Sequence, residues 1–155
     1  MPEQGFDRDF PGHYSRRIRS VSISIPCNAD ATTTVAATLR LLSNSIRLNT
    51  SGAIYERNQE DGVDLDDERF AENNVPCKAI AVSHGKNDSG LFELNFDDAR
   101  YLPFEGAGVI SRWRLEMNGP AALRASITDV ILHIRYTAKE DAGSFKTKAL
   151  ASLKP

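Results

Sequence analysis

The chain has 155 residues, the length of one domain, and a chain of this size buries about 70% of its unfolded surface. Its hydrophobic and charged fractions of 41% and 26% are those of an ordinary soluble globular protein, and its formal net charge of −2 argues against a nucleic-acid-binding module. No apolar run approaches the ~20 residues of a membrane span, and the opening MPEQGFDRDFPGHY has no apolar stretch that would make it a secretory signal.

The clearest strand signal begins at Ser20, where apolar and polar residues alternate strictly as far as Ile25. Such alternation is typical of a strand with one buried and one wet face. Pro26 is expected to end this strand because proline has no N–H to donate. A second alternating run, 32–42, and a third, 45–49, are separated by Ser43-Asn44, so together they predict a hairpin.

The segment 51–74 interrupts this rhythm. It is rich in Asp, Glu, Asn and Gly and poor in large apolar residues. Such a composition buries too little surface to offset the entropy lost on ordering. We therefore predict a long, acidic, mobile loop.

Four more strands are predicted in the second half of the chain. They are expected at 78–82, which carries Ile80 and Val82, and at 92–96, 109–117 and 129–137. Residues 84–90 have the composition of a turn. The last strand is expected to be central in its sheet, since one of its faces is apolar and the opposite face, with Ile131, His133 and Arg135, is mixed.

About seven strands, with no helix before the tail, predict an all-β fold. The expected architecture is an antiparallel two-sheet β-sandwich of jelly-roll type. This domain is expected to span 1–138. The tail, 139–155, is expected to form a short helix or to fray.

No group of residues predicts catalysis or metal binding. The histidines, His13, His84 and His133, are scattered, and no Gly-x-Ser-x-Gly elbow is present. The acidic run Asp64–Glu68 lacks the glycine and terminal glutamate of a calcium loop. No catalytic residue, metal site or cofactor is therefore predicted.

Three smaller features have structural interpretations. Gly106-Ala107-Gly108 precedes a strand, so it predicts a tight turn or a close backbone approach in preference to a phosphate-binding loop. Cys27 and Cys77 are interpreted as free residues, with a single bridge as the alternative. Arg16 and Arg17, close to Tyr14, have the composition of an interface centre or, equally, of a charged strand edge.

Several stretches in one order resemble a known family. They are Phe10–Cys27, Asn87–Phe96, Arg100–Gly108 with Ser111–Glu116, and Ile127–Ala138. They are similar to the B-subunit-binding domain at the C-terminus of the A subunits of bacterial insecticidal toxin complexes. The likeness runs from about Phe6 to Ala138 and is weak across the acidic loop, apart from Asp67–Phe70.

This resemblance implies a non-catalytic docking module. The module would bind the β-propeller of the B subunit, within a B–C cocoon, so that a toxic enzyme passes into the A-subunit channel. It implies a secreted or cell-surface location, with neighbouring A-subunit copies in a full-length pentamer and no contact with nucleic acid. The channel and the pentamer-forming regions have no counterpart in these 155 residues, so membrane insertion is not expected of this domain. The residues expected to contact the partner are Tyr14, Arg16, Arg17, Tyr101, Phe104 and Glu105.

An alternative function is carbohydrate binding, because jelly-roll sandwiches often present exposed aromatic platforms to sugars. Trp113 is the candidate platform. It alternates with Leu115 and Met117, however, which favours a place in the core. A core position would make Trp113→Ala cost about 3–5 kcal/mol, whereas removal of a platform would leave stability almost unchanged.

Overall fold

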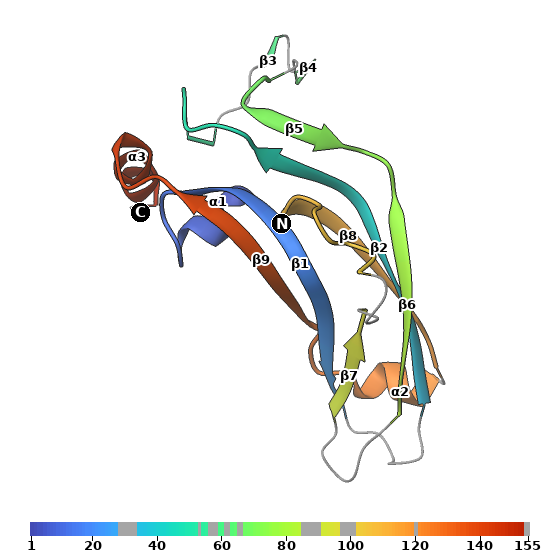
Figure 1. Ribbon diagram of the computed structural model, residues 1–155. Coiled ribbons are helices and arrows are strands. Elements are labelled where there is room, and N and C mark those ends of the chain that lie inside the picture. Colours follow the sequence, from blue (N-terminus) through green and yellow to red (C-terminus); the bar gives the residue numbers. More distant parts are fainter. Residues whose placement is uncertain are drawn as a thin grey trace.

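The computed structural model describes residues 1–27, 34–52, 54–55, 59–60, 63–64, 67–84, 91–96, 102–119 and 121–153, with the backbone alone for 59–60, 63–64, 83–84 and 91–92. The described strands form two antiparallel sheets and a small hairpin whose two strands have two residues each. The predicted all-β sandwich is therefore confirmed (Figure 1). In chain order the elements are α1 (Glu3–Asp7), β1 (His13–Pro26), β2 (Thr34–Arg47), β3 (Gln59–Glu60), β4 (Val63–Asp64), β5 (Phe70–Asn73), β6 (Cys77–His84), β7 (Leu91–Asn95), β8 (Ile110–Asn118), α2 (Ala121–Ser126), β9 (Ile131–Glu140) and α3 (Ser144–Ser152).

One sheet is built around β1, in the order β7–β1–β9. The other sheet is built around β2, which pairs with β8 along one side. Along the other side, the first part of β2 pairs with β6 and its last part pairs with β5. Within the described part of the chain, β9 pairs with β1 alone, so the prediction that β9 is central was wrong. The strand β1, which alternates strictly from Ser20 to Ile25, takes that place.

The core lies between the two central strands. Val21, Ile23 and Ile25 of β1 are buried, and so are Val35, Ala37, Leu39 and Leu41 of β2, as the alternation predicted. Half-buried apolar side chains from β8 and β9 cover its rims. Full burial of one such aliphatic side chain stabilises the fold by about 1.5–3 kcal/mol. On β6 the pattern is reversed: Ala79 and Ala81 face the core, whereas Ile80 and Val82 are 67% and 56% exposed.

The predicted hairpin at Ser43-Asn44 was wrong, because β2 continues through these residues as one strand. A register shift between Leu41 and Ser43 marks a bulge in the pairing with β8. The buried Asn44 side chain accepts a hydrogen bond of 2.7 Å from the N–H of Gly108. Ser43 and Asn44, which are residue types typical of turns, thus form a bulge within one strand and a hydrogen bond to Gly108.

Two short helices, α1 and α2, were missed by the sequence analysis. The tail forms a helix, α3, which is one of the two outcomes expected for it. Phe145 and Ala149 anchor α3 to the fold. Part of the segment 51–74 that was predicted to be a loop is strand, since Phe70 of β5 is buried and β5 pairs with β2. The short strands β3 and β4 also lie in this segment. Residues 53, 56–58, 61–62 and 65–66 of the segment, and 85–90 of the predicted turn, lie outside the described residues.

A buried cluster of charges joins α1 to both sheets. Arg47, 1% exposed, donates two hydrogen bonds of 2.8 Å to the Glu3 carboxylate. Arg16, 3% exposed, pairs with Asp7, which also accepts a hydrogen bond of 2.9 Å from the Tyr55 hydroxyl. We call these five residues the Glu3–Arg47 cluster. A helix of five residues has no stability of its own, so this cluster holds α1 in place.

The Glu3–Arg47 cluster predicts a loss of stability at alkaline pH. Burial first, and then the hydrogen bond to Asp7, raise the pKa of Tyr55 well above its usual value of about 10. Because the folded state keeps the phenol proton more tightly, this stabilisation is complete below about pH 10 and is lost as the pH rises further. In urea denaturation at about pH 8 and about pH 10.5, Tyr55→Phe should lose less stability between the two values than the unchanged chain. Equal losses would contradict this role. Burial also raises the pKa of Tyr136, but this residue is present in both proteins, so it does not affect the difference between them.

Both cysteines are free, Cys27 buried and Cys77 half-buried. None of the described helices has the length and apolarity that crossing a membrane requires.

Candidate functional site

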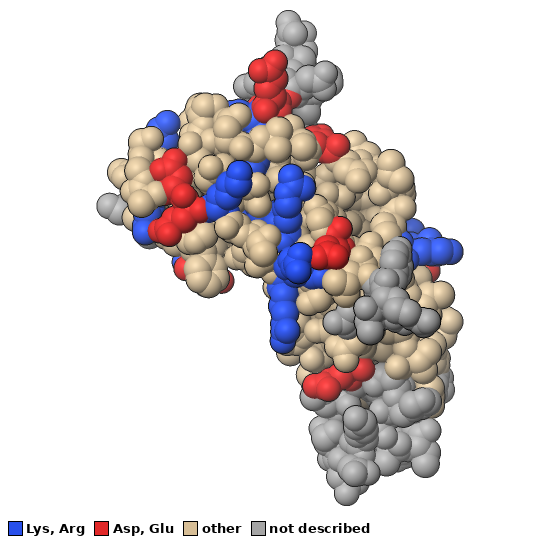
Figure 2. Space-filling view, viewed as in Figure 1, with Lys and Arg blue, Asp and Glu red and all other residues tan. Residues whose placement is uncertain are grey.

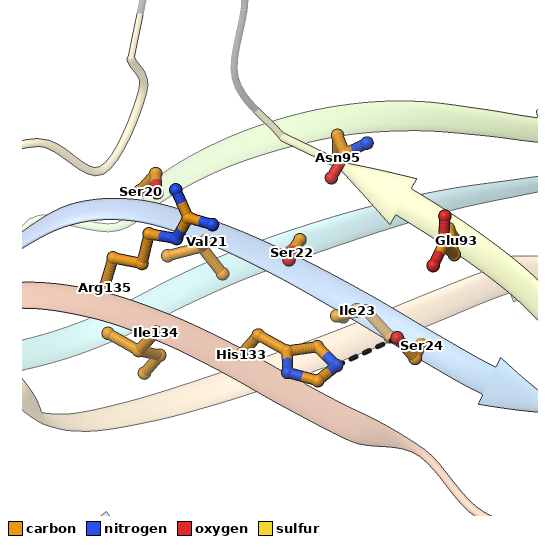
Figure 3. A pocket seen from close by; sticks show the side chains of 10 residues that line it. All are labelled: Ser20, Val21, Ser22, Ile23, Ser24, Glu93, Asn95, His133, Ile134 and Arg135. Atoms are coloured by element: carbon orange, nitrogen blue, oxygen red, sulfur yellow. Dashed lines mark hydrogen bonds between the residues drawn. The ribbon is translucent and has the colours of Figure 1, made fainter.

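The outer face of the β7–β1–β9 sheet carries a polar groove of about 550 Å³. Its floor is formed by Ser20, Ser22 and Ser24, the polar half of the alternation whose apolar half builds the core. Its walls are Glu93 and Asn95 on β7 and His133 and Arg135 on β9 (Figure 3). We call these seven residues the serine groove.

The strand register sets the order of side chains in the serine groove. Asn95, Ser22 and His133 are directly aligned across the three strands. Glu93 lies opposite Ser24, and Arg135 lies opposite Ser20. The Ser24 hydroxyl and His133 Nε2 are 2.8 Å apart and share a hydrogen bond, drawn as the dashed line in Figure 3. Small residues on the central strand, flanked by larger ones, make this surface concave.

The loop 102–108 pairs with the part of β1 that β7 does not reach, and so it continues the β7–β1–β9 sheet along β1. The N–H of Ile18 donates to the carbonyl of Ala107 at 2.8 Å, and the N–H of Gly106 donates to the carbonyl of Ile18 at 2.9 Å. Gly106 has a φ of +82°, a left-handed conformation that favours glycine. At Gly108 a Cβ would lie 2.1 Å from the carbonyl oxygen of Ser45. The predicted tight turn and close backbone approach are therefore both present.

Charged side chains continue the serine groove toward this loop. Arg17 and Arg19 are exposed on β1, and Arg19 pairs with Glu105 at 2.6 Å. The Arg17 guanidinium donates to the carbonyl of Gly106 at 3.4 Å. In Figure 2, Lys and Arg side chains gather in a column over β1 and β9, with a few acidic side chains beside it. This face is therefore polar and mainly basic.

The predicted contact residues fall into two groups. Arg17 and Glu105 are exposed beside the serine groove. Arg16 belongs to the buried cluster, and Phe104, 3% exposed, packs in the core. Tyr14 is half-buried against Phe145, with ring centroids 6.4 Å apart. Tyr101 lies outside the described residues. A contact with a partner stays a prediction, and the buried residues can support it only by holding their exposed neighbours in place.

Sequence reasoning missed the serine groove. The serines at 20, 22 and 24 were interpreted only as the wet side of a strand, and Arg135 as the mixed face of another. The signal was their alternation with core residues, but the pairing of β1 with both β7 and β9 cannot be deduced from that pattern.

The histidines do not converge among the described side chains. His13 pairs in register with Glu140 and His133 with Ser22, so roughly 30 Å of strand separates them. The backbone of His84 lies in β6, and its side chain lies outside the described residues. In the described part of the chain no group of three His, Cys, Asp or Glu could hold a metal ion.

Trp113 is placed where a core residue is expected, not a sugar platform. It is half-buried, its ring meets that of Phe104 edge-on at 5.0 Å, and its Nε1 donates to the Ser111 hydroxyl at 2.7 Å. We predict that Trp113→Ala lowers the free energy of unfolding by about 2–3 kcal/mol, below the value for full burial because part of the ring is exposed. Denaturation followed by circular dichroism measures the change. A loss under about 0.5 kcal/mol would indicate that Trp113 is a surface residue and contradict its place in the core.

Comparison with known proteins gives two matches. The family model of the Tc toxin complex TcA C-terminal TcB-binding domain matches residues 1–138. Toxin subunit YenA2 of Yersinia entomophaga is 39% identical over 145 residues, which cover 94% of this chain and 11% of that subunit. The chain therefore spans only a small part of this relative's length. No solved structure matches the chain.

Proposed function

Because the chain belongs to the family of C-terminal TcB-binding domains of Tc toxin A subunits, we propose that it is a docking module for the TcB subunit. The family match over residues 1–138 is the observation that carries this proposal. The contact is made with the β-propeller of TcB, and docking lets the toxic enzyme pass from the B–C cocoon into the A-subunit channel. The module works outside the producing cell, as part of a secreted or cell-surface complex.

The proposed docking surface is the outer face of the β7–β1–β9 sheet. This face combines exposed arginines with a groove, whereas the opposite face of the same sheet is used by the core. Arginine is among the residues enriched at interface centres. One copy offers a modest patch, and neighbouring copies in a full-length A-subunit pentamer would strengthen binding through multivalency.

The module is proposed to be non-catalytic. Ser24 and His133 form a hydrogen bond, but a nucleophilic serine also needs a group that orients the histidine and donors that stabilise an oxyanion. Among the described residues, the second ring nitrogen of His133 has no hydrogen-bond partner, and His133 is exposed on the sheet surface. We therefore propose that the Ser24–His133 hydrogen bond helps to shape the groove and takes no part in catalysis.

The test is direct binding. The 155-residue chain is immobilised, and purified TcB, alone or as the B–C cocoon, is passed over it in biolayer interferometry. We expect saturable binding with a Kd of about 10 µM or tighter, reversed by free chain in solution. An unrelated β-sandwich of similar charge is the control. No specific signal at several tens of micromolar TcB would contradict the docking function.

A further inference from the structure

We propose that the serine groove binds an extended acidic segment of a partner polypeptide. This inference rests on the proposed docking function for the identity of the partner, TcB. It adds the place of contact and the chemistry of the segment that is recognised.

The shape of the serine groove suits an extended chain. The stretch of β1 from Arg17 to Ser24 is roughly 25 Å long at the rise of a β-strand, enough for about seven or eight residues. The serine hydroxyls on the floor can donate to or accept from a polypeptide backbone. Asn95 and His133, on opposite walls beside Ser22, offer further hydrogen-bonding groups to the same backbone.

The charges of this face select acidic side chains. Among the described residues, neither Arg17 nor Arg135 is paired with a carboxylate, whereas Arg19 is neutralised by Glu105. Arg135 lies opposite Ser20, so Arg17 and Arg135 are separated by roughly 10 Å along β1. Because arginine binds carboxylates through two parallel hydrogen bonds, acidic residues at a similar spacing would fit both positions.

Other ligand classes fit this face less well. None of the described residues that line the groove is Phe, Tyr or Trp, so the groove lacks the large aromatic platform on which a sugar or a nucleic-acid base usually stacks. Glu93 lies opposite Ser24, at the end of the groove away from Arg17 and Arg135, so it would repel a phosphate backbone that carries charge along the whole groove. A polypeptide can instead carry its acidic residues at the arginine end alone. A polypeptide with both backbone groups and acidic side chains matches the groove best.

The first experiment compares four variants in the TcB interferometry assay. Ser22→Tyr fills the groove and Arg135→Glu reverses its charge, and each is expected to lower the affinity at least about tenfold. Thr38→Tyr and Arg114→Glu are the matched controls, at a central and an edge strand on the outer face of the β2 sheet, and should bind like the unchanged chain. Retained binding by both groove variants would overturn the groove while leaving the docking function intact.

The second experiment tests the groove without TcB. A peptide of about eight residues, with two Glu residues about 10 Å apart in one half and Thr elsewhere, is titrated into the ¹⁵N-labelled chain, and the same peptide with Lys in place of Glu is the control. We expect amide shifts confined to 17–24, 93–95 and 133–137 with the acidic peptide only, and weaker shifts in Arg135→Glu. Shifts elsewhere, none at all, or equal shifts with the basic peptide would overturn the inference. Groove-specific shifts combined with no TcB binding would overturn the docking function alone.

Discussion

Replacement of Arg47 by alanine is expected to lower the free energy of unfolding by about 3–5 kcal/mol. Arg47 holds the Glu3 carboxylate through two hydrogen bonds of 2.8 Å, and its guanidinium lies 4.4 Å from the ring centroid of Phe70 and 5.1 Å from that of Phe145. Its removal leaves the buried Glu3 without its main partner, because Arg16 lies 3.7 Å away, beyond hydrogen-bond distance. The loss of both aromatic contacts adds to this cost.

Chemical denaturation followed by the fluorescence of Trp113, the one tryptophan of the chain, measures this change. Arg40→Ala is the matched control, on the same strand, because its ion pair with Glu116 is exposed and should contribute about 1 kcal/mol or less. The double variant Glu3→Gln with Arg47→Met should recover part of the loss, since no charge is left buried and unpaired. Equal effects at Arg47 and Arg40 would contradict the structural role of the Glu3–Arg47 cluster.

Gly108→Ala is the second change with a large expected effect, a loss of about 3 kcal/mol or more. The added Cβ would lie 2.1 Å from the carbonyl oxygen and 2.5 Å from the carbonyl carbon of Ser45, which are backbone atoms of a paired strand. Relief of this clash would separate the loop 102–108 from β2 and break the hydrogen bond from Gly108 to Asn44. Because the same loop pairs with Arg17 and Ile18, the charged end of the docking face would also move.

Two measurements separate these consequences. Thermal unfolding reports the loss of stability, and TcB binding at a temperature where the variant is still folded reports the displaced loop. Gly5→Ala is the control, since a Cβ there meets nothing within 4 Å and alanine favours the helix that contains it. A Gly108→Ala protein as stable as the Gly5→Ala protein would contradict the close approach.

The strands of the core were predictable because their alternation is local. Val21, Ile23 and Ile25 lie on one face of β1 whatever β1 pairs with, and the same holds for β2. By contrast, α1 has no periodic pattern and is held by partners as distant along the chain as Arg47. Ser43-Asn44 has turn chemistry, but a bulge uses the same residue types. On β6, Ala79 and Ala81 face the core while the larger Ile80 and Val82 are exposed, so hydrophobicity alone did not predict which face of this strand is buried.

The candidate site was predictable only in part. Arg17 and Glu105 belong to motifs of the family resemblance and lie on the exposed face. Arg16 has the same residue type and neighbourhood in the sequence as Arg17, yet it is buried, because adjacent residues of a strand point to opposite faces. The serine groove depends on the pairing of three strands that are far apart in the sequence, a relation that composition and spacing do not reveal.

The most direct test of the docking function is a structure of this chain bound to TcB, determined by cryo-electron microscopy or crystallography. We predict that TcB covers the outer face of the β7–β1–β9 sheet, with an acidic segment against Arg17 and Arg135. A complex that leaves this face open, with TcB on the β2 sheet or on the helices, would contradict the proposed docking surface. Failure of the two proteins to form a complex at all would contradict the docking function itself.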